Sequence, residues 1–567
     1  MPLETPARIV SVLATRGYNA DREAVTLLAN ADDPARAIER ALEAAPDDAI
    51  KLSADHVESV LAESDGRPDP STAATETTDS DSGSPTNPTE PGATTADTTD
   101  PDPSVSSGTN PTTSSESGSA VPPETEGSSD AVGAAESAAA TATDRRTTTG
   151  SVATGERSID TDLHDVEIEG DMTGQSTGTG EYSDFVAVFR DRYERLSRQL
   201  RGRINHRPTN TLSSMAGGSE AAIVGMVSDI RSTASGHWLI ELEDTNGVYP
   251  CLVMKDRDTA EQVDELLHDE VIAVEGTLSD DNSDGDGILF VDDLYFPEIP
   301  RTHQPSTADR EVSAALVSDV HVGSQEFMAD AWTRFADWLH TEEAERVEYL
   351  LIAGDMVEGV GVYPDQDEEL DIVDIYDQYR EFSEFLKEVP GDMEIVMIPG
   401  NHDAVRLAEP QPGFDEELRD IMSAHDCRIT SNPSTVTVEG VSVLMYHGVS
   451  LDEVIAELPD EKANYDEPHK AMYQLLKKRH VAPQFGGHTR LAPEERDYLV
   501  IEETPDVFHA GHVHKFGYGK YHNVLTINSG CWQAQTAFQE SVNIDPDCAM
   551  APIVDLDTLD LTIRKFA

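Results

Sequence analysis

The chain has few cysteines, no long apolar run and little positive charge, and each shortage excludes a class of protein. Its four cysteines are scattered and form no Cys-x-x-Cys pair, so neither a disulfide framework nor a zinc ribbon is indicated. We therefore expect a reducing, cytoplasmic setting. No apolar run approaches about eighteen residues, and Met1 to Thr5 lack a basic region followed by an apolar core, so we expect neither a membrane span nor a signal peptide.

Positive charge is scarce, because 40 Lys and Arg stand against 109 Asp and Glu, for a net charge of −69. Such a charge opposes nucleic-acid binding in dilute salt. The acidity runs through every segment, which is typical of a protein from a cell with molar internal salt. At about 1 M salt the Debye length is roughly 3 Å, so repulsion from phosphates nearly vanishes. Nucleic acid stays an allowed partner, bound through close contacts and metal ions, and the alternative is an acidic protein that avoids it.

At 567 residues the chain is too long for one domain. Residues 1–64 predict a small helical domain, in which Asp33-Pro34 indicates a cap followed by the first helical position. We expect this domain to bind a partner, with a mere folding cap as the alternative. Residues 65–180 consist mostly of Ser, Thr, Pro, Gly, Ala and acidic residues, which cannot bury enough apolar surface to fold, so we expect a disordered linker.

Residues 181–207 predict an amphipathic basic helix. An apolar stripe runs along it at helical spacing, and its arginines from Arg190 to Arg203 form the only dense basic cluster in the sequence. Two interpretations fit this pattern equally well. The helix either packs in the fold with a solvated basic face, or it contacts a partner or phosphates.

Residues 208–300 predict a small β-barrel of five strands. A hairpin turn is expected at Thr245-Asn246-Gly247, and a short helix from Thr259 to Leu267 follows the third strand. This order of elements is typical of an OB fold. Trp238 suits core packing as well as base stacking, and we favour protein docking over direct DNA readout for the barrel.

Residues 301–567 alternate strand-like runs with helical segments, of which 329–345, 371–388 and 468–480 are the clearest, and therefore predict a layered α/β domain. Five of the strand-like runs end in polar groups. We call these groups the seven donors: Asp319, His321, Asp355, Asn401, His447, His512 and His514. Each piece alone is common by chance, but five in order at strand ends leave chance a poor explanation.

The chemistry of the seven donors suits metal ions. In an Asp-x-His or His-x-His stretch of extended chain, both side chains leave the same face and can reach one site. Mixed imidazole and oxygen donors suit Mn, Fe, Zn, Ni or Co rather than Ca or Mg alone. We therefore expect two divalent metal ions that share one carboxylate, with Mn²⁺ preferred and Fe, Zn, Ni or Co as alternatives.

The order and spelling of these residues resemble the calcineurin-like metallophosphoesterase superfamily. The resemblance implies a β-sandwich flanked by helices, and it implies a role for each donor. Asp319, His321, Asp355 and His514 would hold the first metal, Asp355 would bridge, and Asn401, His447 and His512 would hold the second. His402 would protonate the leaving oxygen or steady the transition-state charge.

Three further stretches, Gly400 to Pro412, Arg490 to Ile501 and Asn528 to Thr536, resemble the small subunits of archaeal family D DNA polymerases, over roughly residues 181–567. That resemblance implies proofreading 3′→5′ exonuclease activity by two-metal hydrolysis of DNA phosphodiesters. It also implies a large catalytic polymerase subunit as partner, single-stranded or mismatched DNA 3′ ends as substrate, and a sliding clamp nearby.

Two other functions remain open from the sequence. The accessory subunits of eukaryotic replicative polymerases resemble this arrangement but have lost metal ligands and act as scaffolds, so a non-catalytic scaffold subunit is one alternative. Here none of the seven donors is missing, and a scaffold could replace such buried polar groups with apolar packing, so we favour activity. A stand-alone metallophosphatase is the other alternative, disfavoured because such enzymes seldom carry a barrel and a basic helix.

Four more residues and two strands drew attention in the sequence. Arg406 and His488 could contact phosphate or be structural, while for Tyr518 and Trp532 core packing is favoured over base stacking. The strand-like runs 524–527 and 553–556 carry no donor, and we expect them to close the sheets.

Overall fold

A computed structural model describes residues 19–20, 24, 27–28, 34–43, 51–52, 57, 159–176, 180, 182–280, 287–363, 366–487, 489–541 and 544–567. The chain divides into two units, Met1–Ala134 and Ala135–Ala567. No helix in this described part of the chain is long and apolar enough to cross a membrane.

The first unit contains one described helix and a pair of short strands. Helix α3 (Pro34–Glu43) starts at the predicted proline and buries Ala37, Ile38 and Ala41 on one face. The strands β1 (Asn19–Ala20) and β2 (Lys51–Leu52) pair in parallel and were not predicted. The rest of the predicted helical domain, and the predicted linker from 65 to 158, lie outside the described residues.

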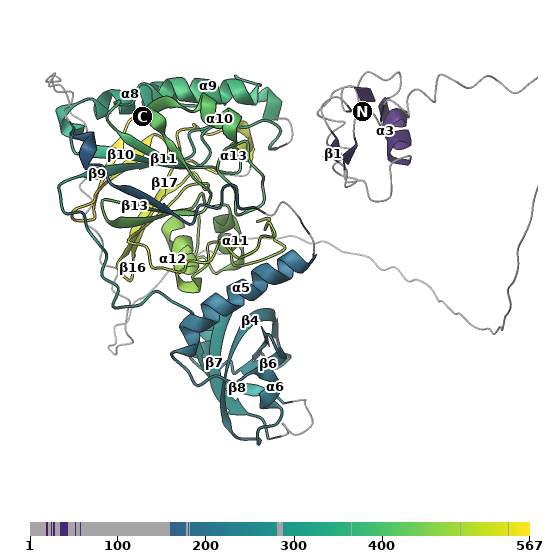
Figure 1. Cartoon of the computed structure of the whole chain (residues 1–567). Coiled ribbons are helices and arrows are strands. Elements are labelled where there is room, and N and C mark those ends of the chain that lie inside the picture. The colour runs from purple at the N-terminus through teal and green to yellow at the C-terminus, as the bar shows by residue number, and fades with distance from the viewer. Residues whose placement is uncertain are drawn as a thin grey trace, which may run out of the picture. The chain divides into compact units, whose positions relative to one another are not determined.

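The second unit begins with a closed five-stranded barrel, whose strands neighbour one another in the order β4-β5-β6-β8-β7 (Figure 1). These strands are β4 (Glu220–Ser232), β5 (Trp238–Asp244), β6 (Gly247–Val253), β7 (Val271–Leu278) and β8 (Leu289–Tyr295). Helix α7 (Thr259–Val263) lies between β6 and β7, so the predicted order of strands and helix is confirmed. The predicted turn is also present, because the Asp244 carboxylate accepts hydrogen bonds from the backbone N–H groups of Asn246 and Gly247 at 2.7 and 3.1 Å.

Helix α5 (Tyr182–Arg201) packs along the barrel through Tyr193, Leu196 and Leu200. Its Arg192 is fully buried, and the guanidinium Nε lies 2.7 Å from the Asp497 carboxylate of the C-terminal domain. The same guanidinium donates to the backbone carbonyl of Asp269 beside the barrel strand β7. The packing interpretation therefore holds for this part of the helix, and its arginines tie the barrel to the following domain.

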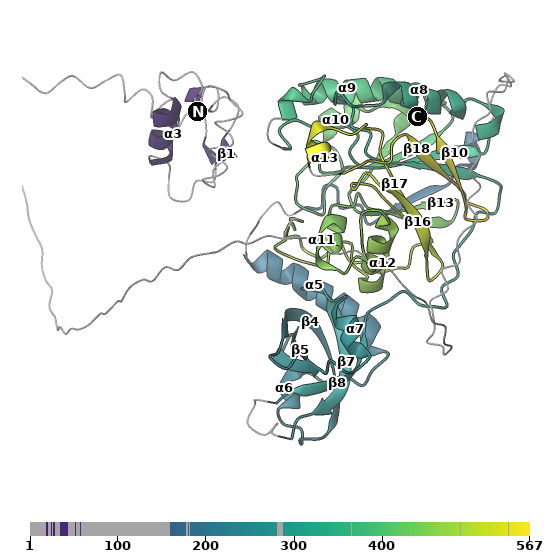
Figure 2. The ribbon, with the colours of Figure 1, turned by 180° about the vertical axis from the view of Figure 1, so that it is seen from behind.

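The C-terminal domain contains two six-stranded sheets (Figures 1 and 2). The first has the order β12-β11-β10-β9-β18-β19 and the second β16-β17-β15-β14-β13-β3. The first consists of β9 (Ser313–Val317), β10 (Val347–Ala353), β11 (Glu394–Ile398), β12 (Arg428–Ile429), β18 (Met550–Asp555) and β19 (Asp560–Lys565). The second consists of β3 (Val166–Glu169), β13 (Ser434–Val438), β14 (Val441–Met445), β15 (Val507–Ala510), β16 (Phe516–Tyr521) and β17 (Val524–Ser529).

Strand β10 shows how the layers pack. Its residues alternate, so that Tyr349 and Leu351 join the core between the two sheets while Leu350 and Ile352 join the core under the outer helices. These helices are α8 (Ala329–Leu339), α9 (Ile375–Leu386) and α10 (Glu416–Ile421). Strands that are apolar on both faces belong inside a layered domain, as the near-continuous apolar run of β10 predicts.

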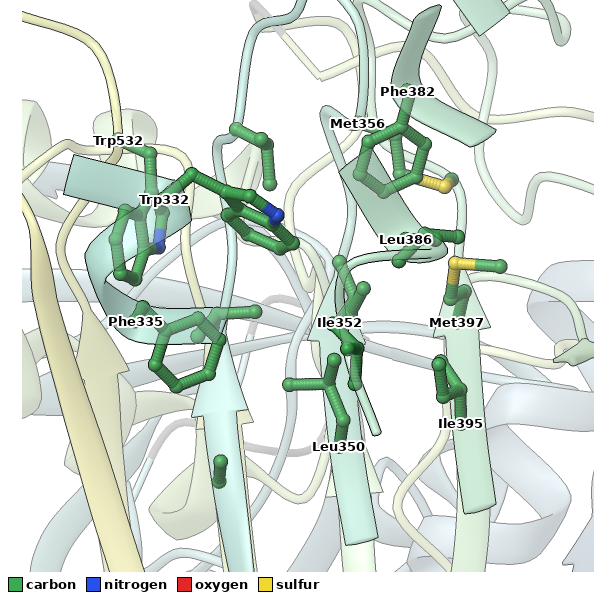
Figure 3. Packing of buried hydrophobic residues seen from close by; sticks show 14 of the residues in the cluster. Trp332, Phe335, Leu350, Ile352, Met356, Phe382, Leu386, Ile395, Met397 and Trp532 are labelled. Carbon is green, nitrogen blue, oxygen red and sulfur yellow. The ribbon is translucent and has the colours of Figure 1, made fainter. Parts of the chain in front are cut away.

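The core under the outer helices is rich in aromatic rings (Figure 3). Trp332 and Phe335 of α8 lie against Trp532, with ring centroids 5.2 Å apart in both cases. Trp532 is fully buried, so the preference for core packing over base stacking is confirmed. A third core joins the second sheet to α11 (Ser450–Glu457) and α12 (Pro468–Lys478).

Some predictions need correction. The prediction of a disordered linker up to residue 180 is wrong for residues 159–176, where β3 pairs antiparallel with β13 and Met172 is fully buried. The predicted helix 329–345 stops at Leu339, and a separate short turn of 3₁₀ helix, η3, covers Glu342–Ala344. The predicted closing strands are not edges, because β17 lies between β15 and β16 and β18 lies between β9 and β19.

Candidate metal centre

The seven donors follow strands that run in parallel. Strands β9, β10 and β11 are parallel neighbours in the first sheet, and β14 and β15 are parallel neighbours in the second. The carboxyl ends of parallel strands meet at one edge, where α/β proteins place reactive groups. Asp319, Asp355 and Asn401 follow β9, β10 and β11, while His447 follows β14 and both His512 and His514 follow β15.

One group of donors gathers around Asp319. The Nε2 atoms of His321 and His514 lie 3.0 Å apart. The Asp319 Oδ1 atom is 3.5 Å from His514 Nε2 and 3.9 Å from His321 Nε2. All three side chains are buried, so three ligand atoms point at one small volume.

A second group gathers around Asp355. Its Oδ2 atom lies 3.1 Å from His447 Nε2, and the same nitrogen lies 3.0 Å from Asn401 Oδ1. His512 completes this group, with one ligand atom from each of Asp355, His447 and His512 within 4.8 Å of the others. Asp355 Oδ2 is also 3.9 Å from His321 Nε2, so this carboxylate lies between the two groups.

Each of the four donor imidazoles is held through the nitrogen that does not face its group. His321 Nδ1 lies 2.8 Å from Glu358 Oε2, and His514 Nδ1 lies 2.9 Å from Gln539 Nε2. His447 Nδ1 lies 2.9 Å from the carbonyl oxygen of Ala353, and His512 Nε2 lies 3.1 Å from Asp452 Oδ2. Partners of this kind fix ring orientation and tautomer at metal sites. The remaining nitrogen of every ring is therefore free to act as a ligand.

The backbone at the donors is strained. Five of them have positive φ between 51° and 72°, in the left-handed region that side chains rarely adopt: Asp319, His321, Asp355, His512 and His514. Glycine neighbours make room for the carboxylates, because a Cβ on Gly400 would lie 2.2 Å from Asp355 Oδ1 and one on Gly511 would lie 2.2 Å from Asp319 Oδ2. Such strain persists where the surrounding structure fixes it and is concentrated at functional sites.

The electrostatics of the site favour positive charge among the donors. Burial alone would raise the pKa of the Asp355 carboxyl, but the imidazoles of His447, His402 and His321 hold it well below its usual range. Burial opposes charge on His447 as well, yet Asp355 raises the pKa of that imidazole to about 10. The buried carboxylates therefore stay ionised, and they attract cations to this edge of the sheets.

His402 lies beside the donors rather than among the seven. Its Nδ1 atom is 2.7 Å from the carbonyl oxygen of Glu358, and its backbone N–H donates to Asp355 Oδ1 at 2.8 Å. A carbonyl oxygen only accepts, so Nδ1 carries the proton in this contact. Burial would lower the pKa of the imidazole, but the carboxylates of Asp355 and Glu358 raise it overall, which favours a charged ring.

The sequence did not point to the residues that support the donors. Glu358 is 1% exposed and contacts His321, and Gln533 donates to Glu358 Oε2 at 2.7 Å. Asp403 accepts from the backbone N–H of Gly400 at 2.8 Å, and burial beside Asp355 raises its pKa to about 7. A glutamate three residues after Asp355 and an aspartate two after Asn401 were the available signals.

The other residues considered from the sequence have structural contacts. Arg406 contacts the Glu494 carboxylate at 2.6 Å and donates to the carbonyl oxygens of Ala408 and Pro410. Tyr518 packs against the core between the two sheets, and Trp238 packs against the barrel core. His488 lies outside the described residues.

The donor set fits divalent metal ions. Carboxylate, amide and imidazole ligands converge in two groups that share a borderline carboxylate, and every imidazole is oriented by a partner. Buried carboxylates and imidazoles at this density are costly unless charges are paired or coordinate metals. Imidazole-rich sites of this kind favour transition metals over Ca²⁺ or Mg²⁺.

Comparison with known proteins assigns the family. A family model for the B-type accessory subunit of DNA polymerases alpha and epsilon matches residues 314–518. The DNA polymerase II small subunit of Halobacterium salinarum is 64% identical over 569 residues, covering 100% of both chains. The chain belongs to the DNA polymerase II small subunit family.

Other members of the DNA polymerase II small subunit family match part of the chain. The protein from Archaeoglobus fulgidus is 42% identical over 384 residues, which cover 66% of this chain and 76% of the relative. The protein from Methanothermobacter thermautotrophicus is 38% identical over 408 residues, which cover 70% and 82%. The resemblance to small subunits of archaeal DNA polymerases is therefore confirmed.

Proposed function

We propose that this small subunit is a 3′→5′ exonuclease that removes the terminal nucleotide of a DNA strand with two divalent metal ions. The proposal includes a calcineurin-like metallophosphoesterase fold for residues 301–567 and an OB fold for the barrel. One observation carries it: the seven donors converge from five strand ends, and each imidazole among them is oriented by a partner.

The two groups of donors suggest how two ions would be shared. Asp319, His321, Asp355 and His514 would hold the first ion, and Asp355, Asn401, His447 and His512 would hold the second. Mn²⁺ is the preferred ion, with Fe, Zn, Ni or Co as alternatives. Ions in such positions would stabilise the attacking and leaving oxygens of an in-line displacement at phosphorus and lower the pKa of a water molecule.

His402 is the candidate general acid. Its Nδ1–H is occupied by the Glu358 carbonyl oxygen, so only Nε2 can transfer a proton to substrate. The raised pKa of this imidazole keeps Nε2 protonated near neutral pH. An acid in this position can protonate the 3′ oxygen that leaves when the terminal phosphodiester is cleaved.

We further propose that the barrel docks a large catalytic polymerase subunit rather than reading DNA. Residues 208–300 contain twenty acidic residues and only three basic ones. Such a surface offers few cations for phosphates, whatever the salt concentration. The buried Arg192–Asp497 pair fixes the barrel against the C-terminal domain, so a partner bound to the barrel would be held in a constant orientation to the candidate metal centre.

Replacement of Asp355 tests the activity. Asp355→Asn removes the charge shared by both donor groups, and we expect nuclease activity on a single-stranded oligonucleotide to fall to background while binding of the large subunit persists. Asp420→Asn on the exposed part of α10 is the matched control, with unchanged activity expected. Full exonuclease activity in Asp355→Asn would refute the proposal. A wild-type chain that binds neither metal nor DNA ends, yet still assembles with the large subunit, would favour the scaffold alternative.

A further inference from the structure

The candidate metal centre forms the floor of a cavity of about 170 Å³ whose walls are aromatic. Tyr363, Tyr465 and Phe538 line it together with donor residues. Phe538 is 46% exposed and Tyr465 is 43% exposed, which is unusual for rings of this size. None of the described residues that line the cavity is a lysine or an arginine, so the walls offer rings rather than cations to a substrate.

Tyr363 and Phe538 form a stacked pair at one end of the cavity. Their ring centroids are 5.1 Å apart with an interplanar angle of 23°. The Tyr363 hydroxyl donates to Glu358 Oε1 at 3.1 Å, and Glu358 in turn holds His321. The Tyr363 ring is therefore fixed relative to the donors, and it presents the exposed ring of Phe538 beside them.

Tyr465 lies at the other donor group. Its hydroxyl donates to Asp452 Oδ1 at 3.1 Å, and the other oxygen of Asp452 contacts His512 Nε2 at the same distance. The two aromatic walls are thus each linked through one carboxylate to one donor group. A phosphodiester bound at the donors would have planar apolar surfaces on both sides.

We propose that Phe538, supported by Tyr363, stacks on an unpaired nucleobase next to the scissile phosphate, and that Tyr465 contacts the neighbouring nucleotide. The inference rests on the proposed function and names its substrate class, an unpaired DNA 3′ end. Stacking of a base on an aromatic ring is worth ~1–3 kcal/mol and tolerates any sequence. Unlike contacts between phosphates and basic residues, stacking is not weakened by salt.

The stacking surface also explains how paired ends would be spared. A base in a duplex has both faces covered, so it must leave the stack before it can lie on Phe538. Unstacking costs a few kcal/mol and least for a mismatched or single-stranded base. The aromatic walls therefore favour mismatched primer ends over correctly paired ones.

A fluorescent base tests this subsite without hydrolysis. We would place 2-aminopurine at the 3′ end of an oligonucleotide whose last linkages are phosphorothioates, and titrate the full-length chain in molar KCl with Mn²⁺. Stacking quenches 2-aminopurine, so the wild type should quench it on binding. Phe538→Ala should bind at least about fivefold more weakly and lose the quenching, given the size of one stacking contact. Phe538→Trp should retain it.

Phe485→Ala is the matched control, because Phe485 is 44% exposed and also packs against other rings but lines a different cavity. This variant should quench like the wild type. Equal quenching by Phe538→Ala and the wild type, or none by the wild type, would overturn the subsite. A loss in Phe485→Ala as large as in Phe538→Ala would overturn it as well, because the effect would not belong to the cavity.

A hydrolysis assay separates the subsite from the activity. The wild type should release a base-bearing 3′ nucleotide in preference to an abasic one, and Phe538→Ala should reduce that preference towards unity. A wild type that quenches 2-aminopurine but releases no nucleotide would refute the proposed exonuclease and leave the subsite standing. Release of both nucleotides at one rate by the wild type would refute the subsite and leave the exonuclease standing.

Discussion

Replacing Glu358 by glutamine should weaken one metal position and largely spare the other. Glu358 Oε2 lies 2.8 Å from His321 Nδ1, and burial, which would raise the pKa of this carboxyl, is outweighed by His321 so that the pKa falls to about 2. The carboxylate is therefore charged and raises the basicity of the ring. Glutamine keeps the shape of the side chain and removes the charge.

The magnitude follows from the role of such partners. Loss of a residue that orients a metal-binding histidine typically lowers metal affinity 10- to 100-fold, or about 1.4–2.7 kcal/mol. Glu358 is 1% exposed, so water cannot replace it and the upper part of this range applies. Asp452 holds His512 in the same way, but its side chain is 43% exposed, so Asp452→Asn should have an effect near the lower limit, on the other position.

Isothermal titration calorimetry of the metal-free chain with Mn²⁺ in molar KCl would resolve the two positions. Glu358→Gln should weaken one of two binding steps, and Asp452→Asn should weaken the other. The double variant should lose approximately the sum, because the carboxylates contact different rings. If either variant weakened both steps equally, or if neither changed the isotherm, the assignment of one carboxylate to each donor group would be refuted.

Two predictions concern the contacts that join the barrel to the C-terminal domain. Arg192→Ala would leave the buried Asp497 carboxylate without its partner, so we expect about 3–5 kcal/mol of destabilisation in chemical unfolding, against less than about 0.5 kcal/mol for the exposed Arg198→Ala. Burial opposes charge on Glu265, but Lys477 and Lys462 lower its pKa to about 2. The folded pKa is below the unfolded one, so this stabilisation is complete above about pH 4.5 and declines from there towards pH 2. The stability difference between wild type and Glu265→Gln should shrink over that range, and a difference that grew would contradict the pairing.

Much of the architecture follows from local patterns in the sequence. The alternation in β10 and the turn at Asn246 were predicted from a period of two and from turn chemistry, because both depend on neighbouring residues. The seven donors were found in the same way, since each lies just past a strand-like run. Their clustering depended only on parallel strands sharing one edge.

Other features could not be predicted because their stability comes from distant residues. The four-residue strand β3 carries only Val166 and Ile168 as apolar residues, and it is ordered because β13 offers it an edge to pair with. Arg192 reads as part of a solvated basic face until Asp497, 305 positions away, is brought beside it. Glu358 and Asp452 differ from other acidic residues only in the ring that each contacts.

The sequence by itself determined which elements form and which side chains carry the metal chemistry, because hydrophobic period, turn residues and donor type are local properties. The tertiary structure alone decided which acidic and aromatic residues support that chemistry, and which arginines are buried. Those assignments depend on contacts between segments far apart in the chain, where burial and pairing set the energy of each charge.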